Sequence, residues 1–169
     1  MVLEALSLTF SAIPDPNSLH LAIRRQEAKT VGRHGWRIVE EEVSWRPSET
    51  AIIIVDMWNK HWSWGATERV NLMVSRMNIV VGRAKEKGVQ IIHAPSDTMD
   101  FYKDHPARLW VADVPHADPP DAIDRPDPPL PVDASDGGSD TGETEGYKAW
   151  NRQHPVIEIK DGDAISDNG

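Results

Sequence analysis

The stretch Thr50-Ala51-Ile52-Ile53-Ile54-Val55-Asp56 decides the expected fold, because it is a continuous apolar run, rich in β-branched residues, that ends on an aspartate. A strand that is covered on both faces, as in a parallel sheet, has this pattern rather than an alternation of apolar and polar residues. The sequence therefore predicts a buried parallel strand that begins near residue 50 and ends at Asp56.

A helix is predicted directly after this strand. Apolar residues recur there every three or four positions, which places them in one stripe along a single helix face. The residues of the stripe are Val70, Met73, Val74, Met77, Val80, Val81 and Ala84. Gly65 and Thr67 introduce the helix, with Thr67 as the expected N-cap. Lys85 and Lys87 suit its last turn, and Gly88 suits the position just after its end.

A second strand is predicted over residues 89–94, because another apolar run stands there and Pro95 ends it. Strand, helix and strand together make a βαβ unit, whose crossover is expected to be right-handed. The expected fold class is therefore α/β with a Rossmann-like parallel sheet.

This sheet is expected to be incomplete. Parallel sheets have helices on both faces, and the sequence predicts only one long helix. Either a partner supplies the remaining elements, or the chain is the front portion of a larger domain, which is the interpretation we favour. The open edge of an incomplete sheet is also expected to seek a partner, so a homo-oligomer is one alternative.

The first 49 residues have a different pattern. Apolar and polar residues alternate over residues 6–13, 19–25 and 36–45, which is typical of half-exposed antiparallel strands. Residues 1–49 are therefore expected to form a β-rich N-terminal extension, and residues 50–169 the α/β domain.

A proline-rich, acidic segment interrupts the α/β domain. Residues 115–146 contain seven of the thirteen prolines and the turn-rich run Asp136-Gly137-Gly138-Ser139-Asp140. Because proline fixes φ and removes a backbone donor, neither a helix nor a central strand is expected to run through this segment. We expect a long surface excursion, followed by one more short strand at residues 155–160.

Charge and composition exclude several classes of function. The net charge is -9, with a net of +2 over residues 1–95 and -11 over residues 96–169, so nucleic-acid binding is not expected. No apolar run approaches the roughly 20 residues that a membrane span needs. The first ten residues lack the basic region and the long apolar stretch of a secretory signal. Together with the absence of cysteine, this composition predicts a cytoplasmic protein without disulfides.

Asp56 is the first candidate for chemistry, because it ends the predicted strand at the edge where open α/β sheets bind their ligands. An aspartate in this position can instead cap a turn. The next eight residues contain three tryptophans, a histidine and a lysine. We expect Trp58, His61 and Trp62 to line a substrate pocket, although the same residues would also pack beneath the proline-rich segment.

These elements resemble a known family. The run Ala51-Ile-Ile-Ile-Val-Asp56-Met57, the long helix and the strand Val89-Gln-Ile-Ile-His93-Ala94 are similar to the opening of the isochorismatase-like cysteine hydrolases, which include the nicotinamidases and related amidohydrolases. The resemblance covers residues 50–95 well and residues 156–168 more loosely. It implies the same Rossmann-like fold.

In that family an aspartate, a lysine and a cysteine form the catalytic group, and the cysteine attacks an amide or similar carbonyl. The resemblance implies that Asp56 handles the proton and that Lys160 assists electrostatically, since an ammonium group keeps a nearby carboxylate ionised. It thus implies a hydrolase that cleaves an amide or related C–N or C–O bond of a small-molecule substrate.

The family's cysteine comes from a later strand-to-helix turn, and this sequence has no cysteine. The nucleophile-bearing segment is therefore expected to be absent from this chain. Two alternatives to an enzyme follow. One is a non-enzymatic binding module that uses the tryptophan-rich wall at residues 58–64 to hold a peptide or a small molecule. The other is an inactive fragment.

No metal or other cofactor is expected. Some family members hold a divalent metal through an Asp-x-His motif after the second strand, and this sequence has Asp97-Thr98-Met99-Asp100 there. His93, on the predicted second strand, is interpreted as a packed or hydrogen-bonded histidine. The acidic residues of the proline-rich segment do not match the twelve-residue calcium loop, so we interpret them as a solvated loop.

Overall fold

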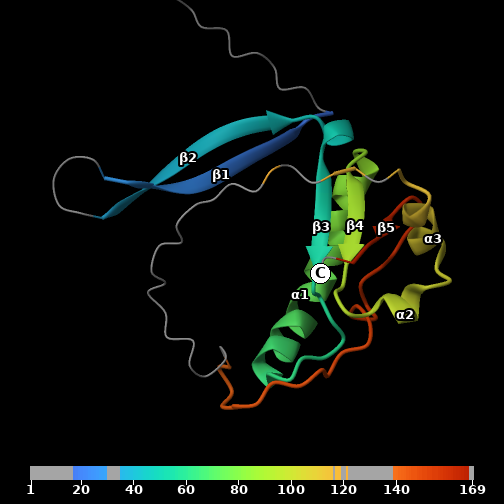
Figure 1. The fold of residues 1–169 in the computed structure, drawn as a ribbon. Coiled ribbons are helices and arrows are strands. Elements are labelled where there is room, and N and C mark those ends of the chain that lie inside the picture. Colours follow the sequence, from blue (N-terminus) through green and yellow to red (C-terminus); the bar gives the residue numbers. More distant parts are fainter. Residues whose placement is uncertain (1–16, 30–34, 116, 119–120, 122–138, 168–169) are drawn as a thin grey trace, which may run out of the picture. The chain divides into compact units, whose positions relative to one another are not determined.

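The computed structural model describes residues 17–29, 35–115, 117–118, 121 and 139–167 (Figure 1). The chain separates into two compact units, Met1–Thr50 and Ala51–Gly169. The first contains an antiparallel pair of strands, and the second contains a parallel sheet of three strands together with helices. The protein is therefore mixed α/β. The strand predicted over residues 6–13 and most of the predicted surface excursion lie outside the described residues.

The first unit is a β-hairpin with no buried residue in either strand. β1 (Leu19–Ala28) and β2 (Trp36–Trp45) pair antiparallel over their whole length, which confirms the two strands that the alternating pattern predicts here. Exposed ion pairs join the strands, among them Arg25 with Glu41. A short 3-10 helix, η1 (Pro47–Glu49), follows.

The second unit begins with the predicted βαβ arrangement. β3 (Ala51–Val55) and β4 (Gln90–Ala94) are parallel neighbours, and α1 (Trp64–Glu86) connects them. Gly88 follows the end of α1 with a φ of 96°, a conformation that glycine adopts without the strain that a β-carbon brings. The predicted end of the helix is therefore confirmed.

The start of α1 lies one turn before the predicted N-cap. Ser63 is the N-cap residue, and Thr67 lies buried in the first turn. The Thr67 hydroxyl nevertheless bonds the chain that enters the helix: it accepts the His61 N–H at 2.9 Å and donates to the His61 carbonyl at 3.3 Å. A threonine that bonds the entering chain from inside the helix has the same sequence signature as an N-cap, and this is why the prediction was wrong.

The third strand of the sheet is β5 (Ala164–Ile165), which pairs parallel with β4. The strand predicted over residues 155–160 is wrong, because this segment forms turns, in one of which the Ile157 N–H bonds the His154 carbonyl at 3.0 Å. Within this segment Ile157 is almost fully buried, whereas Val156 is 49% exposed.

Two short helices that the sequence pattern does not reveal follow β4. They are α2 (Met99–Tyr102) and α3 (Pro106–Ala112). At the start of α3, Pro106 occupies the first turn and the His105 side chain caps the helix by accepting the Ala107 N–H at 3.2 Å. Both helices are too short to display an apolar period of 3.6 residues.

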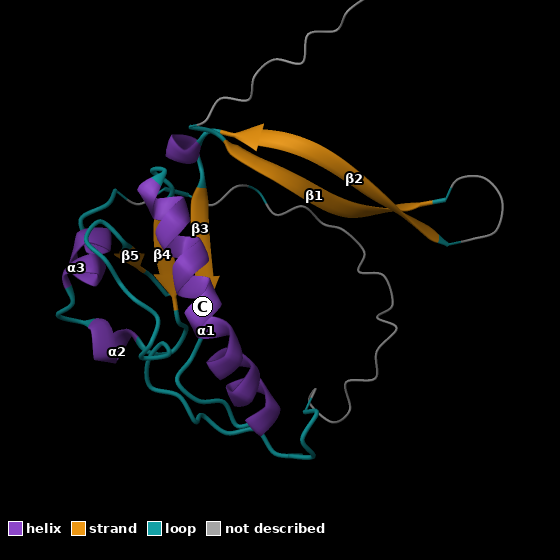
Figure 2. Ribbon diagram, turned by 180° about the vertical axis from the view of Figure 1, so that it is seen from behind, coloured by secondary structure: helices purple, strands orange, loops and turns teal. Residues whose placement is uncertain are grey.

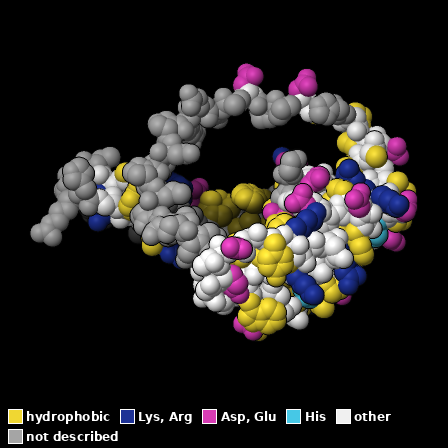
Figure 3. Space-filling view, turned by 60° about the horizontal axis from the view of Figure 1, so that its bottom comes forward, with side chains coloured by type: hydrophobic (Ala, Val, Ile, Leu, Met, Phe, Trp, Pro, Cys, Tyr) yellow, Lys and Arg dark blue, Asp and Glu magenta, His cyan; other side chains and the backbone are white. Residues whose placement is uncertain are grey.

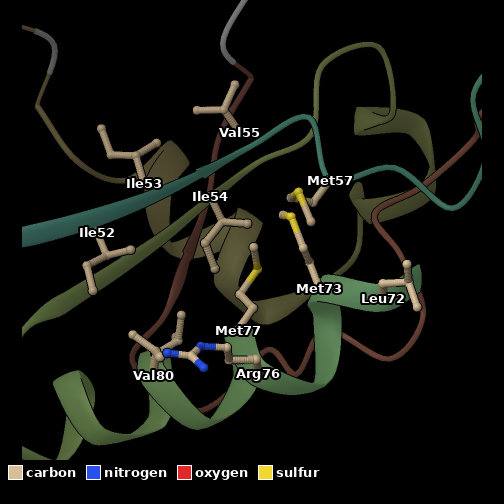
Figure 4. Close-up of a pocket in the computed structure, with 11 residues that line it drawn as sticks. Ile52, Ile53, Ile54, Val55, Met57, Leu72, Met73, Arg76, Met77 and Val80 are labelled. Atoms are coloured by element: carbon tan, nitrogen blue, oxygen red, sulfur yellow. The ribbon is translucent and has the colours of Figure 1, made fainter. Parts of the chain in front are cut away.

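The layers of the second unit leave one face of β3 uncovered. α1 lies across one face of the sheet, and α3 lies beside β5 (Figures 1 and 2). The side chains of Ile52 and Ile54 point toward α1, whereas those of Ile53 and Val55 point to the opposite side (Figure 4). Ile53 is 58% exposed and Val55 is 48% exposed. Among the described residues, β3 is therefore an edge strand with one open face, and not the strand covered on both faces that the sequence predicts.

The core lies between α1 and the sheet and continues toward α3. Ile91 on β4 and Ile165 on β5 have no exposed surface, and Val74 of α1 is also buried. Ile165 also belongs to a cluster with Tyr102 and Ala107 from the two short helices. Between β3 and α1 the packing is looser and leaves an open apolar groove of about 510 Å³ (Figure 4).

Candidate active site

Asp56 directly follows β3, at the carboxyl end of the parallel sheet. Its N–H bonds the carbonyl of Ala94, the last residue of β4, at 3.2 Å, so the strand pairing extends to this residue. The φ of Asp56 is 50°, in the left-handed region that residues with a side chain rarely adopt. Such backbone conformations cost free energy and gather at functional sites.

One oxygen of the Asp56 carboxylate is held firmly and the other is not. Oδ1 accepts the Ser96 N–H at 3.0 Å and the Ser96 hydroxyl at 2.5 Å. Within the described part of the chain, Oδ2 makes no hydrogen bond. Ser96 is itself held by the Trp58 indole, whose Nε1 donates to the Ser96 carbonyl at 3.1 Å. Asp56 is therefore a fixed carboxylate with one oxygen available for chemistry.

Trp58, His61 and Trp62 follow Asp56 along the chain, and Trp150 joins them in an aromatic cluster. The rings of Trp58 and Trp150 stack with centroids 4.0 Å apart, and the ring of His61 lies parallel to Trp150 at 5.7 Å. Trp62 meets His61 at 5.1 Å. The structure thus brings together all three residues that were predicted to line a substrate pocket.

Trp150 is the member of this cluster that the sequence pattern did not reveal. It arrives with residues 151–154, which lie beside the chain that leaves β3: the Asn59 N–H bonds the Arg152 carbonyl at 3.0 Å, and the His154 N–H bonds the Met57 carbonyl at 2.7 Å. A single tryptophan, here between Ala149 and Asn151, carries no local signal for such a contact. Its indole Nε1 is buried without a hydrogen-bond partner in the described part of the protein.

A buried polar chain adjoins the site through Gln153, which forms a bridge pair with Trp58. Gln153 places Oε1 2.9 Å from His93 Nδ1, and His93 Nε2 lies 3.4 Å from the Asp163 carboxylate. Asp163 also pairs with the Lys85 ammonium group. The structure confirms that His93 is a packed, hydrogen-bonded histidine, since it has no exposed surface. The Gln153 N–H also bonds the hydroxyl of Tyr102, whose pKa is raised by burial.

Lys160 does not join Asp56. Its ammonium group pairs with Glu158 at 3.0 Å, and its backbone N–H bonds the Asp163 carboxylate at 2.6 Å. Lys160 lines a cavity of about 640 Å³ together with Gln90, the first residue of β4, whereas Asp56 lies past the last residue of β3. The two residues predicted to form a catalytic pair are therefore at opposite ends of the sheet.

Other kinds of site find no support in the described residues. These residues contain no group of three or more histidine, aspartate or glutamate side chains that could hold a metal ion. No helix among them has the length and apolar character to cross a bilayer. Acidic and basic side chains are interspersed on the face seen in Figure 3, without a basic stripe.

The site therefore combines a fixed carboxylate, a stacked aromatic cluster and an unpaired indole N–H. Such a set can accept a proton from a bound molecule and hold a flat group beside it. Comparisons with known proteins add no relative: no family model, no curated protein and no solved structure matches the chain.

Proposed function

We propose that the chain acts as a hydrolase on an amide or related C–N or C–O bond of a small molecule, as its resemblance to isochorismatase-like hydrolases implies, and that Asp56 transfers the proton. A Rossmann-like sheet, of which β3, β4 and β5 would be part, belongs to the same proposal. The observation that carries it is the strained Asp56 backbone, with a φ of 50°, combined with the two bonds from Ser96 that fix one carboxylate oxygen.

Asp56 is suited to the role of a general base. Its Oδ2 takes the proton of a nucleophile as that nucleophile attacks the carbonyl carbon, and the same proton then passes to the leaving nitrogen or oxygen as the C–N or C–O bond breaks. The sequence has no cysteine, so the nucleophile in this proposal is not a thiol of these 169 residues. A water molecule beside Oδ2 would serve as this nucleophile, because it carries a proton that Oδ2 can take.

The aromatic cluster is suited to binding the substrate. Stacked rings of Trp58, Trp150 and His61 offer flat apolar surface, which favours a planar acyl group. Lys160 has no part in this proposal.

The replacement Asp56→Asn tests the role of the carboxylate. The asparagine side-chain oxygen can still accept both bonds from Ser96, but it cannot take a proton. We expect release of ammonia from a panel of primary aryl and alkyl amides to fall by roughly 100-fold or more, the usual contribution of a general base. Asp100→Asn is the matched control, because Asp100 is an exposed aspartate in the first turn of α2. Equal turnover by the two variants would contradict the proposal, and so would a wild-type protein that hydrolyses no amide or ester.

A non-enzymatic binding module is the second candidate function. It is favoured by the stacked rings of Trp58, His61 and Trp150, because flat apolar surface can hold a planar ligand without any proton transfer. In that case aryl amides would quench tryptophan fluorescence equally in the wild type and in Asp56→Asn, without turnover in either. Loss of turnover with unchanged quenching in the variant would instead support the hydrolase.

A further inference from the structure

The apolar groove between β3 and α1 runs along the free edge of β3. Among the described residues, β4 is the only strand that pairs with β3, so the other edge of β3 is open. Ile52 and Ile54 point toward α1 and Ile53 and Val55 point to the opposite side, yet all four line the groove (Figure 4). A single groove touches both faces of an edge strand only along its open edge. The groove therefore lies where a further strand would pair.

The backbone groups of two residues face this open edge. The Asp56 N–H bonds the Ala94 carbonyl at 3.2 Å and so points toward β4. In a strand, the backbone polar groups of successive residues point alternately to its two edges. The N–H and C=O groups of Ile54 therefore face β4, whereas those of Ile53 and Val55 face the groove. A strand lying in the groove would bond them.

β3 lacks the features that ordinarily prevent the addition of a strand. Edge strands of natural proteins are protected by charged side chains, by proline or by a bulge. The five residues of β3 run from Ala51 to Val55 without a charge or a proline, and they pair with β4 residue for residue. An apolar edge of this kind is a template for an extended segment of another chain.

α1 continues the apolar surface past the edge of β3. Leu72, Met73 and Val80 line the groove and remain about half exposed or more. Met57 and Met77 line it too, and methionine side chains adapt to the shape of a bound partner because they are unbranched and flexible. Apolar side chains on the α1 side of an added strand would therefore be buried in the groove.

Arg76 is the charged residue of the groove, where its side chain lies beside Val80 (Figure 4). Each other basic residue of α1 has an anionic partner. The pairs are Arg69 with Asp140, Arg83 with Glu86, and Lys85 with Asp163. Within the described part of the chain, the Arg76 guanidinium group makes no ion pair and no hydrogen bond. A carboxylate on a segment docked in the groove would supply the missing partner.

We propose that the free edge of β3 binds an extended peptide segment of a partner protein, which adds to the sheet as a fourth strand. The segment is apolar on both faces, and one glutamate or aspartate on its α1 side pairs with Arg76. A second copy of β3 fits less well, because residues 51–55 contain no carboxylate and that of Asp56 is held by Ser96. The site is independent of the proposed hydrolysis, since it uses neither Asp56 nor the aromatic cluster.

The peptide acetyl-Thr-Val-Val-Glu-Val-Val-Thr-amide is a suitable probe. In an extended conformation its glutamate shares one face with the second and sixth residues, both valine. At saturation we expect it to slow hydrogen exchange of the Ile53 and Val55 amides at least about tenfold, because both N–H groups gain an acceptor. The Ile54 amide already faces β4 and is the internal reference, so its exchange should change little.

Reversal of charge tests the role of Arg76. The same peptide with lysine in place of glutamate should bind the wild type roughly five- to tenfold more weakly, as expected when an exposed ion pair becomes a like-charge pair. In Arg76→Glu this preference should reverse. Arg83→Glu is the matched control, because Arg83 is an exposed arginine of the same helix that does not line the groove. It should keep the wild-type preference.

Arg76→Gln is a second variant if Arg76→Glu alters the fold, which circular dichroism would reveal, and it should bind both peptides with similar affinity. The proposal is overturned if the glutamate peptide leaves the exchange of Ile53 and Val55 unchanged, or if the wild type binds both peptides equally. It is also overturned if both variants still prefer the glutamate peptide. Finally, protected Ile53 and Val55 amides in a free protein that sediments as a dimer would place a second copy at this edge and contradict the proposal.

Discussion

The strands of the hairpin are twice as long as β3 and β4 of the three-stranded sheet, yet none of their residues is fully buried. β1 and β2 contain ten residues each, whereas β3 and β4 contain five each. Every residue of β1 and β2 keeps exposed surface, whereas Ile91 on β4 has none. Isolated two-stranded hairpins are marginally stable in water, because apolar burial and not strand length supplies most of the free energy of folding.

The ion pairs of the two units also differ in burial. In the hairpin, Arg25 and Glu41 pair on the surface with about half of each side chain exposed. In the second unit, Asp163 is 2% exposed and holds both Lys85 and His93. An exposed ion pair contributes little because water screens it, whereas the loss of one partner from a buried pair leaves the other uncompensated. Stability is therefore expected to be concentrated in the second unit.

The replacement Ile91→Ala should have the largest effect on stability. It removes a fully buried side chain and leaves a cavity, so we expect the free energy of unfolding to fall by about 4 kcal/mol. Urea titration with amide hydrogen exchange read on β4 measures this change. Ile38→Ala is the matched control on β2, where the side chain is 57% exposed, and it should cost less than about 1 kcal/mol. Similar losses for the two variants would remove the contrast between the units.

The replacement Asp163→Asn should have the next largest effect. It leaves the Lys85 ammonium group without its anion, and we expect a loss of about 3 kcal/mol, at the lower end for a buried pair because Lys85 is partly exposed. Glu158→Gln, which breaks the exposed pair with Lys160, should change the free energy of unfolding by no more than about 0.5 kcal/mol. If both variants unfold at the wild-type urea concentration, the buried chain is not important for stability.

The sequence predicted the parts of the second unit that local pattern determines. The apolar runs and the stripe of α1 identified β3, α1 and β4, because strand and helix periods are visible within a few residues. The pattern also brought Trp58, His61 and Trp62 into one candidate site. It could not reveal Trp150, because that contact joins segments about ninety residues apart and has no local signature.

The wrong predictions, for Lys160 and for residues 155–160, also concern contacts between segments that are distant in the sequence. The resemblance matches Lys160 to a catalytic lysine by its place in the sequence. In the structure Lys160 lies near Gln90, at the start of β4, whereas Asp56 lies past the end of β3. Residues 155–160 contain a strand-like apolar run, but they form turns in place of a strand, with Ile157 buried and Val156 exposed. In both cases contacts with distant segments decide where the residue lies, so propensity alone is a weak guide.

The replacement Val43→Ala tests the hairpin at its apolar contact. Val43 lies opposite Leu21 in the strand pairing. Such cross-strand pairs contribute about 0.2–1 kcal/mol, so we expect faster hydrogen exchange of the β1 and β2 amides and no change on β4. Exchange that accelerates equally on β4 would mean that the two units unfold together.

The smallest effect is expected from the charges of the hairpin. The hydrogen bonds from Arg37 and then from Arg25 hold the pKa of Glu27 below its ordinary value of 4.5. Because the folded-state pKa is lowered, this contribution to hairpin stability is present above pH 4.5 and is lost as the pH falls through the lowered value. A carbon-13 titration of the Glu27 carboxyl should show its pKa rise toward 4.5 in Arg37→Ala. A pKa that is identical in wild type and variant would contradict this.

The pairing of β4 with β5 also indicates how much the length of the chain between these two strands can change without a large loss of stability. β4 meets β3 across 39 positions, from Ala51 to Gln90, and meets β5 across 72 positions, from Ile92 to Ala164. The entropy of closing a flexible loop grows with the logarithm of its length, so a doubling costs only about 0.6 kcal/mol. That is less than the loss of one buried methylene group, at about 0.8 kcal/mol. Provided that α2, α3, residues 139–146 and the residues from 150 onward are kept, insertions in the rest of the chain between β4 and β5 are therefore expected to change stability little.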